Sequence, residues 1–125
     1  MLKNVLLVAL GGAIGSALRF VIQESLHRTI QGFAPYGTFA VNMIGCFLIG
    51  LFFGWLEQEK YLSDAANIFL ISGFCGGFTT FSTFAMQGQG ALIDNRPIHA
   101  LTYIILSVAL GLILAYAGLK LSEKL

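Results

Sequence analysis

The chain has 125 residues, of which 57% are hydrophobic and only 10% charged, and its mean hydropathy is +0.82. Soluble domains carry about a quarter charged residues, so this composition excludes a soluble domain and indicates an integral membrane protein. The net charge of +1 comes without any basic cluster, which argues against a nucleic-acid partner. The length accommodates about four spans of ~20 residues, and hence one transmembrane domain over residues 1–125 in a lipid bilayer.

The first apolar segment, residues 4–22, is expected to be a retained helix rather than a cleaved signal peptide, because further apolar spans and no secreted domain follow it. Gly11 and Gly15 have the spacing that lets another helix backbone approach closely. Arg19, near the end of this segment, allows two interpretations. Its side chain either reaches the membrane interface or attracts anions into a water-filled mouth.

The second predicted span covers residues 36–56 and contains one deeply placed amide, Asn42. Thr38 lies four residues earlier and therefore shares a helix face with Asn42. An amide in hydrocarbon needs hydrogen-bond partners. We expect Asn42 either to bond to another helix or to donate to something that passes along this face.

The third span, which begins near residue 65, contains the most unusual stretch of the chain. Residues 72–84 include three glycines, five hydroxyl side chains and four phenylalanines. Glycine has poor helix propensity, and Ser and Thr hydroxyls compete for backbone groups. We therefore predict a helix break over residues 76–80 and a second helix from Phe81 to about residue 92. Such a break requires that the freed backbone groups be buried in protein, face water or bind an ion.

The fourth span is predicted over residues 98–121, with Pro97 at the first helical position. Tyr103, Ser107 and Gly111 follow one another at intervals of four and therefore form a stripe on one face. The stripe is polar at one end and small at the other, so it suits either a polar path or close helix packing.

Positive charges are almost balanced between the two sides that a four-span layout defines. Four lysines fall on the side of both termini and the middle loop, and three arginines fall on the other: Lys3, Lys60, Lys120 and Lys124 against Arg19, Arg28 and Arg96. The positive-inside rule therefore predicts almost no preference for either orientation in the membrane. We predict dual topology, in which the chain inserts both ways and pairs antiparallel with a second copy.

No arrangement of residues in the sequence indicates an enzyme. His27 and His99 lie near predicted span ends without metal-ligand neighbours, and no Asp, Glu or Lys is deep in a span. A proton-coupled transporter usually needs such an ionisable group. In residues 72–84, hydroxyls and aromatic ring edges can donate to an anion, while carbonyls released at a break suit a cation. The residues thus suit a small-anion path beside a cation site, but phenylalanines at helical spacing in a membrane protein are usually packing residues, so the residues alone favour packing.

The segment from Gly73 to Phe84, GFCGGFTTFSTF, strongly resembles the signature of the Fluc (CrcB) family of small bacterial fluoride channels. The resemblance extends to Gly12-x-x-x-Ser16-x-x-Arg19, to the Gly37–Asn42 segment GTFAVN, and to the four-span layout of the whole chain. It implies an all-α antiparallel homodimer in the bacterial inner membrane. Two pores would export cytoplasmic fluoride passively, and a structural sodium ion would lie at the centre.

The resemblance also assigns roles to individual residues. The carbonyls of Gly76 and Thr79 in each subunit would bind sodium, Arg19 would be the cation of the vestibule, and the remaining residues would line the pore: Asn42, Phe81, Ser82, Thr83, Phe84, Tyr103 and Ser107.

The chain departs from the family pattern at two positions. Many relatives have a glutamate where this chain has Gln87, and some have a hydroxyl residue where it has Gly111. Two other functions remain as alternatives. A small-multidrug-type antiporter of dual topology is disfavoured by the absence of a membrane carboxylate, and a non-transporting accessory subunit is the third reading.

Overall fold

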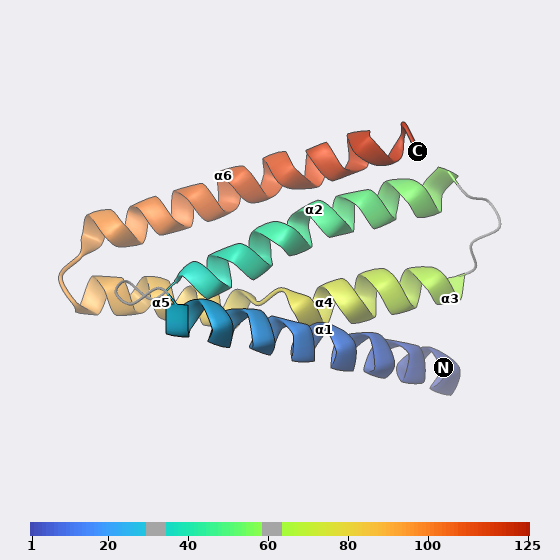
Figure 1. Ribbon diagram of the computed structural model, residues 1–125, viewed down its shortest axis with the longest axis horizontal. Helices are drawn as coiled ribbons and strands as arrows, with labels where there is room; N and C mark the ends of the chain where they lie inside the picture. Colours follow the sequence, from blue (N-terminus) through green and yellow to red (C-terminus); the bar gives the residue numbers. More distant parts are fainter. Residues whose placement is uncertain (30–34, 59–63) are drawn as a thin grey trace.

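A computed structural model describes residues 1–29, 35–58 and 64–125, and the regular structure in these ranges is entirely helical. Four stretches are long and apolar enough to cross a membrane, as the sequence predicted: Leu2–Thr29, Tyr36–Gln58, Asp64–Ile93 and Pro97–Ser122. The spans run back and forth, so both termini lie at the same end of the bundle (Figure 1). The chain is therefore an all-α, multi-pass membrane protein.

Three of the spans are single helices, α1 (Leu2–Thr29), α2 (Tyr36–Gln58) and α6 (Pro97–Ser122). The third span consists of four pieces in sequence: α3 (Asp64–Asn67), the π-helix η1 (Ile68–Cys75), α4 (Gly76–Phe78) and α5 (Phe81–Ile93). Large apolar side chains are exposed on each span, for example Leu10 on α1 and Leu112 on α6. Exposed apolar surface of this kind is what a lipid solvent requires.

Helix α1 is longer than predicted, because it continues to Thr29 instead of ending at residue 22. Polar side chains do not end a helix when they find partners along its surface. Gln23 donates to the Thr38 hydroxyl of α2 at 3.0 Å, and Arg28 pairs with Glu24 one turn earlier at 3.6 Å. Arg19 consequently lies well inside α1 and is not at its end.

Helix α2 packs along α6, and α1 packs along η1 and α4 on the other side of the bundle (Figure 1). Glycines allow both contacts. A Cβ atom at Gly11 or Gly15 would meet the backbone of η1, and one at Gly50 would meet the backbone of α6. The predicted close approach at the Gly11 and Gly15 pair is confirmed. The third span is thereby held between α1 and α2.

The predicted break in the third span is confirmed, but it is shorter and later than expected. Gly76 and Gly77 are helical, and only Thr79 and Thr80 leave the helix, with φ/ψ of −90°/161° and −147°/118°. Gly77 is small for a packing reason, because a Cβ atom there would lie 2.7 Å from the Gly12 carbonyl oxygen. Its helix propensity therefore does not decide where the helix ends.

The π-helical segment η1 was not expected from the sequence. The Gly76 N–H donates to the Ile71 carbonyl, five residues earlier, which is the π-helical pattern. Widened turns of this kind within α-helices are frequent at functional sites. In this chain the wide turns lead directly into the break.

The connection between α5 and α6 is a tight turn. Asn95 adopts a left-handed conformation with φ of 58°, and the Arg96 N–H donates to the Ala91 carbonyl at 2.8 Å. Pro97 begins α6, as predicted. Lys60, which entered the charge count, lies within residues 59–63, outside the described ranges.

Candidate functional site

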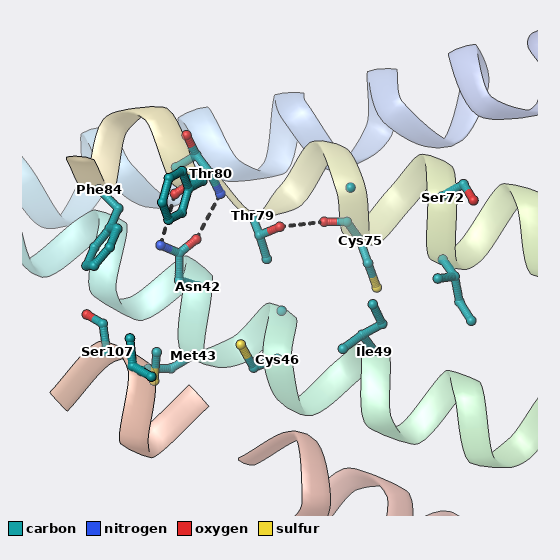
Figure 2. A pocket seen from close by; sticks show the side chains of 15 residues that line it. Asn42, Met43, Cys46, Ile49, Ser72, Cys75, Thr79, Thr80, Phe84 and Ser107 are labelled. Carbon is teal, nitrogen blue, oxygen red and sulfur yellow. Dashed lines mark hydrogen bonds between the residues drawn. The ribbon is translucent and has the colours of Figure 1, made fainter. Parts of the chain in front are cut away.

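The break in the third span is held from α2 by the side chain of Asn42. The Thr80 N–H donates to Asn42 Oδ1 at 2.8 Å, and Asn42 Nδ2 donates to the Thr80 carbonyl oxygen at 3.1 Å (Figure 2). Both polar groups of one peptide unit are thus satisfied by one amide. The sequence left open whether Asn42 bonds to another helix or donates to a passing group. It does bond to another helix, and its amide still carries a second hydrogen.

The hydroxyl of Thr80 caps the N-terminus of α5. Its oxygen accepts from the Thr83 N–H at 3.3 Å, which is an ordinary N-cap, and the hydroxyl donates to Thr83 Oγ1 at 3.2 Å. Ser82 Oγ lies 3.5 Å from Thr80 Oγ1. Ser82 and Thr83 therefore surround the start of α5, next to the break and not farther along the membrane.

Arg19 reaches the break from the opposite side. Its Nε donates to the Gly77 carbonyl at 3.0 Å, and α1 lies on the face of the third span that is turned away from α2 (Figure 1). A continuous helix would give this carbonyl the N–H of Phe81. The contact therefore replaces a lost helical bond. Nothing in the sequence pattern indicated it, because the two residues are 58 positions apart.

Two further carbonyls lose their helical donors to side-chain oxygens at the break. A continuous helix would direct the Thr80 N–H to the Gly76 carbonyl, but Asn42 takes it. It would likewise direct the Thr83 N–H to the Thr79 carbonyl, but the Thr80 hydroxyl takes it. Gly76 itself is exposed in this chain. These are the two carbonyls that the family resemblance assigns to sodium, so the residues present fit a cation held by backbone oxygens.

No side-chain alternative for a metal was found: the ranges that the structure describes contain no group of three or more His, Cys, Asp or Glu side chains that could hold an ion.

Three aromatic rings form a continuous row from the start of α5 to α6. The ring centroids of Phe81 and Phe84 are 5.7 Å apart, and those of Phe84 and Tyr103 are 5.0 Å apart. Phe81 is 79% exposed although it sits at the centre of the span, so the part of the chain that the structure describes leaves most of this ring uncovered. The Tyr103 hydroxyl donates to Gln87 Oε1 at 3.2 Å. Gln87, the residue that departs from the family pattern, thus extends the row toward the end of the bundle.

A cavity of about 410 Å³ lies between α2, the third span and α6. Six of the residues predicted for the site line it: Asn42, Gly76, Thr79, Phe81, Phe84 and Ser107. Figure 2 shows Asn42 on α2, Thr79 on the third span and Ser107 on α6 around the cavity. Ser107 Oγ is buried and has no hydrogen-bond partner within the described chain. The cavity therefore combines an aromatic wall with polar hydrogens that are free to bind a ligand.

Four other predicted residues lie outside the lining of this cavity. Arg19 contacts the far side of the break, Ser82 and Thr83 cluster on the Thr80 hydroxyl, and Tyr103 packs against Phe84, which lines the cavity. Gly111 packs against α2, where a Cβ atom would lie 3.2 Å from Cys46 Sγ. A hydroxyl residue at this position would be crowded.

The fold and site define a small multi-pass membrane protein whose third span is broken near its middle, beside an aromatic and polar cavity. The model of the family described as CrcB-like protein, Camphor Resistance (CrcB), matches residues 6–119, and the chain belongs to this family.

Three bacterial relatives, each named fluoride-specific ion channel FluC, are similar along almost their whole length. The chain is 43% identical to the Flavobacterium psychrophilum protein over 124 residues, which cover 99% of this chain and 100% of the relative. It is 41% identical to the Phocaeicola vulgatus protein, with 98% and 100% covered, and 40% identical to the Chlorobaculum tepidum protein, with 98% and 97% covered. The family is one of ion channels and not of enzymes, as the sequence predicted.

Proposed function

We propose that this protein is a fluoride channel through which cytoplasmic fluoride leaves the cell passively. The observation that carries the proposal is the cavity beside the break, where Phe81, Phe84, Asn42 and Ser107 meet in a chain similar to channels named for fluoride. Fluoride holds its water tightly, so a pore must offer several replacement donors at once and still release the ion. The second amide hydrogen of Asn42 and the unpartnered Ser107 hydroxyl are such donors.

The aromatic row supplies the rest of the path. Ring edges carry a partial positive charge and attract an anion weakly, which suits rapid release. The Thr83 and Ser82 hydroxyls and the Tyr103 hydroxyl continue the polar track on either side of Phe81 and Phe84. Arg19 uses one of its five N–H groups on Gly77, which leaves four to attract fluoride into the vestibule.

The working unit in this proposal is an antiparallel homodimer with a central sodium ion. Phe81 is 79% exposed at the level of the break, and a second, inverted copy would cover it. The carbonyls of Gly76 and Thr79 number two in each chain, so two copies supply four oxygens for one ion. The nearly equal distribution of positive charge supports insertion in both orientations.

The driving force requires no pump. Hydrogen fluoride crosses membranes as a neutral weak acid and ionises in the near-neutral cytoplasm, where the anion is trapped. An inside-negative membrane potential favours exit of the anion by about 2.3 kcal/mol per 100 mV. A passive pore in the inner membrane is therefore sufficient for resistance to fluoride.

Fluoride efflux from liposomes that contain only the purified protein tests the proposal. We expect efflux of fluoride and not of chloride from the wild type. Phe81→Ile and Phe84→Ile should each lower fluoride efflux about tenfold or more, since about 1.4 kcal/mol of lost stabilisation is a factor of ten in rate. Phe20→Ile is the matched control, because Phe20 is exposed on α1, away from the cavity.

Other results of the efflux assay would support other functions. If the wild type shows no fluoride efflux, a non-transporting accessory subunit is the function that remains. Efflux coupled to a cation gradient would indicate an antiporter. Unchanged efflux in both phenylalanine variants would remove these rings from the pore. A reporter fused to the C-terminus tests dual topology separately, and its detection on one membrane face alone would refute it.

A further inference from the structure

We infer that Asn42 and Thr80 are positioning residues for the cation site, because their side chains determine which carbonyls of the break are available to bind an ion. This inference rests on the proposed sodium site. It assigns to Asn42 a role beyond lining the pore, since the same amide that faces the cavity also releases a carbonyl for the cation.

Three carbonyls next to the break each accept a side-chain donor. Thr79 Oγ1 donates to the Cys75 carbonyl at 3.0 Å, Arg19 Nε donates to the Gly77 carbonyl at 3.0 Å, and Asn42 Nδ2 donates to the Thr80 carbonyl at 3.1 Å. A carbonyl that already accepts a strong donor is a poorer cation ligand, because its lone pair and partial charge are engaged. These three oxygens are thereby withdrawn from competition for an ion.

The Gly76 carbonyl lies between the engaged Cys75 and Gly77 carbonyls, the Thr79 carbonyl directly precedes the engaged Thr80 carbonyl, and neither accepts a side-chain donor from the described residues. The Thr79 N–H donates to the Cys75 carbonyl and the Thr80 N–H to Asn42 Oδ1, so both backbone donors that could reach the Gly76 carbonyl in a helix are used elsewhere. The Thr83 N–H, which would reach the Thr79 carbonyl, is held by Thr80 Oγ1. Two acceptor oxygens, one on Asn42 and one on Thr80, thus account for the release of both carbonyls.

Removal of either side-chain oxygen should return an N–H to the carbonyl that it released. In Asn42→Ala, the Thr80 N–H loses this acceptor, and the Gly76 carbonyl is the one that a continuous helix would give it. In Thr80→Ala, the Thr83 N–H would likewise have the Thr79 carbonyl. Thr80→Ser keeps the hydroxyl and should keep the carbonyl available. The coupling runs through backbone hydrogen bonds, so sodium affinity should respond even though neither side chain contacts the ion.

Sodium binding is measured on the purified full-length protein in detergent. The midpoint of thermal unfolding is recorded as sodium chloride replaces N-methylglucamine chloride at constant ionic strength. Ligand that binds only the folded protein raises this midpoint, so the sodium concentration at half-maximal shift reports affinity. We expect Asn42→Ala and Thr80→Ala to raise that concentration about tenfold or more, which is usual when groups that orient metal ligands are removed. Thr80→Ser should resemble the wild type.

Two matched controls change the same residue types away from the break. Asn4→Ala alters an exposed amide on α1, and Thr29→Ala removes a hydroxyl that bonds the Ser25 carbonyl at 2.8 Å on an exposed helix end. Both should retain wild-type sodium dependence. If Asn42→Ala does not fold, Thr80→Ala and Thr80→Ser decide the question by themselves.

The outcomes separate this inference from the proposed function. Wild-type sodium dependence in Asn42→Ala and Thr80→Ala would overturn the inference and leave the sodium site in place. A wild type that does not respond to sodium would overturn both, whereas fluoride efflux from liposomes would still decide whether the protein is a channel.

Discussion

Replacement of Gly15 by alanine tests whether the position of the third span depends on close approach to α1. Gly15 is buried where α1 crosses α4 and η1. A Cβ atom at this position would lie 2.9 Å from the Phe78 backbone nitrogen and closer still to the Phe74 carbonyl oxygen. Ordinary contacts of a Cβ atom begin at 3.4 Å. Both obstacles are main-chain atoms, so no side-chain rotation relieves them, and the helices must separate.

The expected magnitude follows from two opposing terms. Overpacking of a close-packed contact costs about 1–3 kcal/mol. Alanine in place of glycine inside a helix returns about 0.5–1 kcal/mol. The central values of the two terms give a net fall of about 1 kcal/mol in the free energy of unfolding of Gly15→Ala, and their extremes give about 0–2.5 kcal/mol. Gly12→Ala, one turn away, is the matched control, because its Cβ atom would have only an ordinary contact with the Gly73 carbonyl oxygen at 3.7 Å. In Gly12→Ala, only the gain in helix propensity should change the free energy of unfolding.

Unfolding by sodium dodecyl sulfate in mixed micelles, followed by circular dichroism, measures both variants under one condition. We expect the midpoint of Gly15→Ala to fall below that of the wild type and the midpoint of Gly12→Ala to equal or exceed it. Fluoride efflux should fall with Gly15→Ala, because separation of the helices also moves the Arg19 contact with Gly77. Equal midpoints for the two variants would refute the packing argument.

Two further predictions concern the end of the bundle that carries the α5–α6 turn. Tyr103→Phe should lower the free energy of unfolding by about 1 kcal/mol, because the hydroxyl bond to Gln87 Oε1 is lost while the ring remains; the same detergent titration measures it, and an unchanged midpoint would show that the bond adds nothing. Asn95→Val should cost about 1–2 kcal/mol in that assay, because a β-branched residue resists the φ of 58°, whereas Asn95→Gly should be tolerated; equal effects of the two substitutions would contradict the conformational explanation.

Much of the fold could be predicted because the membrane imposes simple rules. Apolar length indicated the four spans, and Pro97 marked the start of α6. The glycine spacing of α1 indicated close packing, which the structure confirms at Gly11 and Gly15. These signals are local in sequence, and hydrocarbon leaves the backbone few alternatives to a helix.

The exact place of the break could not be predicted, because it depends on residues distant in sequence. Glycine propensity favoured a break at Gly76 and Gly77, yet both are helical, and Gly77 is packed against α1. The helix ends instead where Asn42 offers an amide to Thr80, 38 residues away. The Arg19 contact with Gly77 was missed for the same reason, since neither interpretation of Arg19 included a backbone acceptor within the membrane.

The order of the chain has a consequence for how the break enters the membrane. Exposed backbone polar groups are costly in hydrocarbon, and the broken segment carries several of them. Arg19 and Asn42, which satisfy the Gly77 carbonyl and the Thr80 peptide unit, both precede the break in sequence. Because synthesis proceeds from the N-terminus, α1 and α2 are made before the third span leaves the ribosome. The Gly77 carbonyl and the Thr80 peptide unit thus have their partners already in the bilayer when they arrive, so these contacts do not have to wait for α6.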